Sequence, residues 1–212
     1  MHDEPLISCE PPLRPPQRVE PIAILASGNG SNFESICNAA SKGDLHAEIR
    51  CVIFNNPGAG VAARAKARNI ESHLIDHRRF EGRREFDQAV VAALQASGAR
   101  WVVMAGWMRI ATTELLHAFP DRVVNIHPSL LPSFRGLHAV QQALDAGVTL
   151  AGCTVHIVRP EVDSGPILGQ AAVRVRPTDT VESLHRRIHA AEHILYPRAL
   201  QRALTQSTAA SS

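Results

Sequence analysis

The chain has 212 residues, a formal net charge of +2 and 45% hydrophobic residues, which suits one α/β domain with a sizeable core. The charge is nearly balanced and contains no basic block, and no apolar stretch reaches the length of a membrane span, so neither a nucleic-acid nor a membrane partner is indicated. Four scattered cysteines without a Cys-x-x-Cys pair argue against a disulfide framework or a zinc knuckle and favour a reducing, cytoplasmic location.

Residues 1–18 are acidic at first and then rich in proline, so we expect a disordered extension that is not a secretory signal. Short apolar runs then alternate with helical patterns. The expected strands are residues 22–26, 48–55, 72–76, 100–106 and 122–127, and the expected helices are residues 32–41, 60–69, 83–97, 112–119 and 138–147. Near-continuous Val, Ile and Leu in these strands is typical of a buried parallel sheet with right-handed crossovers.

The last third of the sequence follows a different pattern. Residues 151–159 and 167–176 read as two strands joined by the turn-rich "PEVDSGP", which predicts an antiparallel hairpin with a long loop. A final helix is expected from about residue 180 to 202. The predicted fold is α/β, a Rossmann-like, mostly parallel sheet flanked by helices with an antiparallel hairpin addition near the C-terminus. We expect a single catalytic domain over residues 19–204 and a flexible tail over 205–212.

The first strand is followed by "SGNGSN", which places Gly28 and Gly30 directly before a helix. Glycines allow a tight turn, and the N–H groups at a helix N-terminus attract anions. Ser31 or Asn32 would either cap this helix or hydrogen-bond a phosphate. The dinucleotide fingerprint fails at Phe33, and the sequence has no Gly-Lys-Ser/Thr, which leaves a site for one phosphate or carboxylate, or an ordinary Gly-rich turn.

A second group of polar residues lies at the end of the strand over 122–127. Asn125 and His127 point to the same side of that strand, which Pro128 ends, and Asp163 is carried by the loop of the predicted hairpin. A carboxylate near an imidazole favours its charged form, and an Asn amide can donate to a developing oxyanion. Because neither Ser nor Cys stands in a nucleophile elbow, the attacking group would be a substrate amine or water. The alternative is a polar strand end at which Asn125 begins a turn and His127 has no catalytic role. His156, on the strand before Asp163, is either a residue that supports this site from behind or a purely structural one.

The motifs "SGNGSN", "NIHPSLLPSFRG", "DSGPI" and "AEHILYP" stand in the order and spacing found in one enzyme family. Over residues 21 to about 200 the chain resembles the phosphoribosylglycinamide formyltransferases, the folate-dependent formyltransferases of purine biosynthesis. The second motif is shared with the wider formyl-tetrahydrofolate superfamily.

The resemblance implies 10-formyltetrahydrofolate as co-substrate, glycinamide ribonucleotide as acceptor, no metal, and a monomer or weak homodimer. It implies that the amine attacks the formyl carbon, that Asn125 and protonated His127 stabilise the oxyanion, and that Asp163 assists proton transfer. The implied phosphate- and glycinamide-binding residues are Gly30, Ser31, Asn32, Gly106, Pro128, His189 and Glu192. The implied folate-binding residues are Arg83, Met104, Met108, Arg109, Ile110, Asn125, Val162 and Asp163.

Several residues leave alternatives open. Ile110 fits a core as well as a ring pocket, and Arg83 fits a solvated surface as well as a glutamate site. Trp107 replaces a smaller aromatic residue, and His189 stands where relatives place Lys or Gln. His185, His189 and His193 share one helix face at spacings of four but lack the His-Glu-x-x-His order, so we do not expect a metal site.

Three other functions are compatible with part of the pattern. A formyltetrahydrofolate hydrolase would use water in place of the amine and normally carries an N-terminal regulatory domain. A formyltransferase for initiator methionyl-tRNA would need a second, basic domain. A catalytically silent module that binds a nucleotide or a folate would not need Asn125, His127, Asp163 and Glu192 together.

Overall fold

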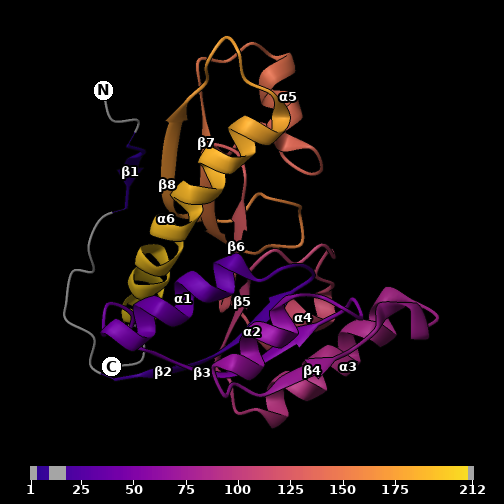
Figure 1. Cartoon of the computed structure of the whole chain (residues 1–212). Helices are drawn as coiled ribbons and strands as arrows, with labels where there is room; N and C mark the ends of the chain where they lie inside the picture. The colour runs from indigo at the N-terminus through magenta and orange to yellow at the C-terminus, as the bar shows by residue number, and fades with distance from the viewer. Residues whose placement is uncertain (1–3, 10–17, 210–212) are drawn as a thin grey trace.

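An eight-stranded sheet forms the centre of the computed structural model, which describes residues 4–9 and 18–209 (Figure 1). Its order is β1-β8-β7-β6-β5-β2-β3-β4. The strands are β1 (Leu6–Ser8), β2 (Glu20–Ala26), β3 (Ala47–Phe54), β4 (Ser72–Leu74), β5 (Trp101–Met104), β6 (Val123–His127), β7 (Leu150–Ile157) and β8 (Ile167–Arg174). Strands β2 to β6 are parallel, whereas β7 runs antiparallel to both β6 and β8. The predicted fold class and the antiparallel hairpin are confirmed.

Helices cover both faces of the sheet because successive strand residues point to opposite sides. Ile22 and Ile24 of β2 pack in one core cluster with α1, α2, α5 and α6, whereas Ala23 and Leu25 pack in a second cluster with α3 and α4. The helices are α1 (Ser31–Lys42), α2 (Val61–Ala67), α3 (Arg83–Ala96), α4 (Thr113–Ala118), α5 (Ala139–Asp145) and α6 (Val181–Ala209), with a 3-10 turn η1 (His77–Arg79). Within the described residues no helix is long and apolar enough to cross a membrane.

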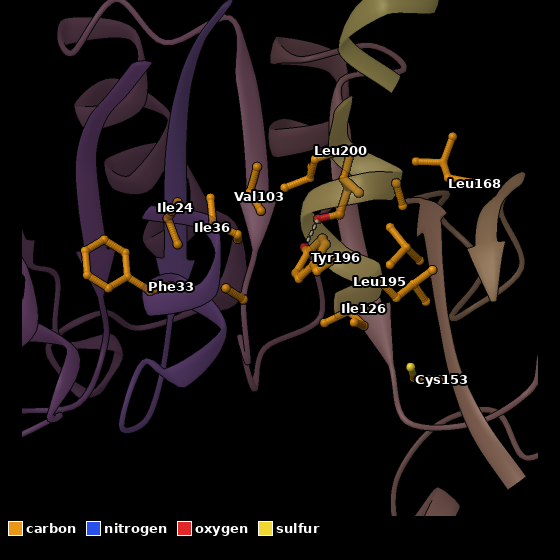
Figure 2. Close-up of a cluster of buried hydrophobic side chains, with 14 of the residues drawn as sticks. Ile24, Phe33, Ile36, Val103, Ile126, Cys153, Leu168, Leu195, Tyr196 and Leu200 are labelled. Atoms are coloured by element: carbon orange, nitrogen blue, oxygen red, sulfur yellow. Dashed lines mark hydrogen bonds between the residues drawn. The ribbon is translucent and has the colours of Figure 1, made fainter. Parts of the chain in front are cut away.

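The long helix α6 runs along one face of the sheet and packs against β8, β7 and β6 (Figure 1). Figure 2 shows Leu195, Tyr196 and Leu200 reaching from α6 into the larger core cluster. The Tyr196 side chain is fully buried, and its hydroxyl donates to the carbonyl oxygens of Met104 in β5 and Val124 in β6, at 3.0 and 3.2 Å. One phenol therefore fixes α6 against two neighbouring strands, at the last residue of β5 and the second residue of β6.

Two segments differ from the predicted ends of the domain. Within the extension expected to be disordered, Leu6–Ser8 forms β1 and pairs antiparallel with β8, while residues 1–3 and 10–17 lie outside the described part. The main-chain N–H and C=O groups on that side of β8 can hydrogen-bond to a further strand, and β1 supplies one there, with Ile7 packed against the larger core cluster. At the other end, α6 continues to Ala209, into the stretch expected to be a flexible tail.

Candidate active site

A cavity of about 530 Å³, here called the central cleft, opens where β5 and β6 end. It lies at the carboxyl ends of parallel strands, where ligands bind in α/β sheets of this kind. Five separate segments of the chain line it, within residues 104–111, 125–128, 136–141, 156–163 and 181–185. The predicted site residues that it brings together are Met104, Gly106, Met108, Arg109, Ile110, Asn125, His127, Pro128, Val162 and Asp163.

His127 is the last residue of β6 and is 6% exposed. Its Nε2 lies 2.8 Å from the carbonyl oxygen of Phe134, and since a carbonyl only accepts, Nε2 carries a hydrogen and donates. Its Nδ1 lies 3.2 Å from Oδ2 of Asp163. Nδ1 is therefore the nitrogen that shares a proton with the carboxylate, while Nε2 holds the ring in place.

Asp163 is held in an uncommon backbone conformation, with a φ of 50°. The Gly136 N–H donates to its Oδ2 at 2.9 Å, and Nε2 of His156 lies 3.6 Å from its Oδ1. Burial opposes ionisation of this carboxyl, but the His156 ring, the Gly136 N–H and the charge on His127 outweigh burial, so the pKa of Asp163 lies below its usual value. The carboxylate is thus ionised between two imidazoles.

His156 belongs to this cluster, a role that the sequence left open. It is 1% exposed, and its Nδ1 donates to the carbonyl oxygen of Ile157 at 3.0 Å. The Asn125 amide nitrogen lies 3.3 Å from its Nε2. His156 stands opposite Asn125 in the β6–β7 pairing, so strand register brings the two side chains together.

The segment after β5 is anchored by side chains at both of its ends. Near its start, the Met108 N–H donates to Ser27 Oγ at 2.8 Å. At its far end, the N–H and Oγ1 of Thr112 both donate to Oδ2 of Asp87, at 2.7 Å each. Burial raises the pKa of Asp87, and these two donors oppose the rise. The folate-side residues therefore lie on a segment tied to β2 and α3.

An outer cavity of about 480 Å³ adjoins the central cleft and shares part of its lining. Arg83 lies here, exposed at the start of α3, together with Arg109, whose guanidinium lies 5.8 Å above the Phe86 ring. Ile110 is 49% exposed, which excludes the core alternative for this residue. Trp107 instead packs inward and stacks on Phe86, with ring centroids 5.9 Å apart.

The loop before α1 turns at Gly30, which is the N-cap residue of that helix. Its φ is +77°, and a Cβ at this position would lie 2.7 Å from Cγ2 of Val61, so only glycine fits. Of the two alternatives for Ser31 and Asn32, capping is excluded, because no side chain caps α1. Their side chains reach across to α6 instead.

These contacts with α6 bring together the predicted phosphate and glycinamide residues. Ser31 Oγ lies 2.8 Å from Nε2 of His189, and the Asn32 amide nitrogen donates to Oε2 of Glu192 at 2.8 Å. Glu192 is 5% exposed, and burial raises its pKa to about 7 despite the hydrogen bond from Asn32. Asn32 Oδ1 is buried without a hydrogen-bond partner among the residues that the structure describes. An amide oxygen and a carboxylate, both buried, form a site suited to a ligand N–H donor.

Comparison with known proteins places this geometry in a family. Residues 20–200 match the family described as formyl transferase. The chain is 40% identical to a phosphoribosylglycinamide formyltransferase of Bacillus subtilis, over 86% of this chain and 93% of that one. It is 42% identical to a trifunctional purine biosynthetic protein adenosine-3 of Gallus gallus, but spans only 18% of that protein's length. A glycinamide ribonucleotide transformylase from Symbiobacterium toebii superposes with a TM-score of 0.85 at 44% identity, covering 86% of each chain.

Proposed function

The chain belongs to the formyl transferase family, and we propose that it transfers the formyl group of 10-formyltetrahydrofolate to the amine of glycinamide ribonucleotide. The observation that carries this proposal is the cluster of Asn125, His127 and Asp163 beside a buried acceptor pair on α1 and α6. Glu192 lies one helical turn before Tyr196, whose hydroxyl bonds to the carbonyl oxygen of Val124, the residue before Asn125, so the amine-binding pair lies near the reactive cluster.

In this proposal the two substrates approach from opposite sides. The phosphate binds at Gly30, Ser31 and Asn32, and the glycinamide nitrogen donates to Glu192 and Asn32. The folate ring lies in the central cleft against Met104 and its neighbours, and the glutamyl tail follows the outer cavity, where Arg83 and Arg109 supply positive charge. Gly106 and Pro128 border the reacting atoms.

The proposed chemistry is a direct displacement at the formyl carbon. The amine must be neutral to attack, and Glu192, with a pKa of about 7, is suited to accept a proton from the bound ammonium. A C–N bond forms to the glycinamide nitrogen while the formyl oxygen gains negative charge. The Asn125 amide N–H and the His127 ring stabilise that charge.

The second half of the reaction breaks the bond between the formyl carbon and the folate nitrogen. A proton lost from the attacking amine passes through Asp163 to this nitrogen, so the products are the formylated amide and the free folate amine. Asp163 orients the His127 ring, and the His156 ring lies against both the carboxylate and the Asn125 amide.

An absorbance assay of folate deformylation with and without glycinamide ribonucleotide tests the proposal. Release that requires the nucleotide, together with a formylated product in mass spectra, is the expected result. Release without the nucleotide would identify a hydrolase, and folate binding without release would identify a silent module. In single-turnover assays His127→Ala should react about 10²–10³ times more slowly. His117→Ala, an exposed substitution on α4, is the matched control.

We also infer a cytoplasmic location and a monomer or weak homodimer. Light scattering during size-exclusion chromatography over a hundredfold concentration range tests the oligomeric state. A stable higher oligomer at all concentrations would refute it.

A further inference from the structure

Three imidazole rings form a continuous row along one face of α6. The rings of His185 and His189 are nearly parallel, with centroids 5.8 Å apart, and those of His189 and His193 lie 4.5 Å apart at an interplanar angle of 55°. We call these three residues the histidine row. The proposed reaction steps use none of their rings as an acid or a base.

The histidine row joins two cavities. His185 lines the central cleft, and His193 lines a second cavity of about 800 Å³ between α1 and α6, which Ser31 also lines. His189 stands between them and bonds to Ser31 Oγ. Nε2 of His193 is buried and has no hydrogen-bond partner within the described part of the chain. The row therefore lies along the side of the proposed phosphate site.

The side chain bonded to Ser31 is the imidazole of His189, whose charge depends on pH, whereas a Lys or Arg at this position would be charged permanently. On its own helix His189 Nε2 lies 4.0 Å from Oε2 of Glu192. The charged groups around the row from the other elements are Glu34 and Lys42 of α1, Asp44 after α1, Arg64 of α2, Arg198 further along α6, and His138 before α5 beside His185. Of these, Arg64 lies 3.8 Å from Glu34, which already balances part of its charge.

The environment disfavours a proton on His189 and His193 in the ligand-free protein. Burial lowers the pKa of His189, and the neighbouring His193 and His185 rings lower it further. Burial also lowers the pKa of His193. A phosphate dianion next to Ser31 would have the opposite effect, because an opposite charge within a few ångströms favours the protonated ring.

We propose that the histidine row links phosphate binding to proton uptake: His189 gains a proton when the substrate phosphate binds beside Ser31, and His185 and His193 set how readily it does so. This inference rests on the proposed function for the position of the phosphate. Affinity is then highest at low pH, where His189 is already charged, and falls as pH rises until the ring is neutral in the complex as well. A rise of one unit or more in the proton affinity of the ring corresponds to a loss of at least about tenfold in affinity between pH 6 and 8.

Calorimetric titration with glycinamide ribonucleotide, in two buffers of different ionisation enthalpy, measures this proton uptake directly. His189→Gln and His189→Lys are the test variants, and the 37% exposure of the His189 side chain leaves room for both. At pH 7 the wild type should take up about half a proton or more beyond either variant, because subtracting the variants removes the titration of the nucleotide and of Glu192. Affinity of His189→Lys should change less with pH than that of the wild type.

His193→Gln provides a second, independent readout. Removing one like-charged neighbour makes His189 easier to protonate before ligand binds, so uptake at pH 7 should fall and its maximum should move to higher pH. Equal uptake in wild type and His189→Gln, or affinities that change in parallel from pH 6 to 8, would overturn the inference but leave the proposed function standing. His189-dependent uptake without formyl transfer would support the inference and refute the function.

Discussion

Replacing Glu192 with Gln is expected to stabilise the ligand-free protein above pH 7 while removing its ability to bind the amine. In the folded chain burial raises the pKa of this carboxyl from 4.5 to about 7, whereas in the unfolded chain it is solvated. Each tenfold difference in proton affinity corresponds to about 1.4 kcal/mol, so the ionised carboxylate costs the folded state about 3 kcal/mol above pH 7. Gln carries no charge, and its amide can pair with the Asn32 amide, whose Oδ1 has no partner among the described residues.

The pH dependence separates this effect from a simple packing change. The raised pKa stabilises the folded state fully below about pH 4.5, and this stabilisation disappears as pH rises to about 7. The difference in free energy of unfolding between Glu192→Gln and wild type should therefore grow from near zero at about pH 4 to about 3 kcal/mol at pH 8. Urea titrations at several pH values measure it, with the exposed Glu48→Gln as control. A difference that stays constant over this range would refute the reasoning.

Three further substitutions test separate parts of the structure. Asp163→Asn should lower kcat by about 10²–10⁴ with little change in KM for the nucleotide, because it removes the carboxylate that orients His127 and carries the proton; an unchanged kcat in steady-state assays would contradict this. Tyr196→Phe should reduce the free energy of unfolding by about 1–3 kcal/mol at constant m-value, because two strand carbonyls lose a buried donor; equal urea midpoints would exclude it. Gly30→Ala should cost at least about 1–2 kcal/mol in the same assay, and more if Val61 cannot move, whereas Gly28→Ala, where a Cβ meets no atom within 4 Å, serves as its control.

The order of elements could be predicted because each strand carries a local signal. Runs such as residues 101–104 are apolar throughout, and glycines or prolines separate them from amphipathic helices. Hydrophobic periodicity and these breaks were therefore enough to predict the order of strands and helices. The same is true of Asn125 and His127, since alternation along one strand places both on the same side. Their position at the end of β6, next to Pro128, is confirmed.

Contacts between distant segments could not be predicted in this way. His156 reaches Asn125 only through the register of β6 and β7, which no local pattern specifies. The bonds from Ser31 and Asn32 to α6 depend on how two helices pack, and they replaced the capping role that the local sequence favours. Strand β1 was not predicted because three residues within a proline-rich stretch are too few to show a periodic pattern of apolar side chains.

Strand β1 has a practical consequence for handling the protein. Strand β1 pairs with residues 170–172 on the outer side of β8, so a truncated chain that begins at Arg18 would leave the main-chain groups of these residues unpaired at one border of the sheet. Exposed edge strands of this kind can pair with strands of other molecules, which leads to dimers and aggregates. We therefore expect a chain that keeps β1 to aggregate less than one that lacks it.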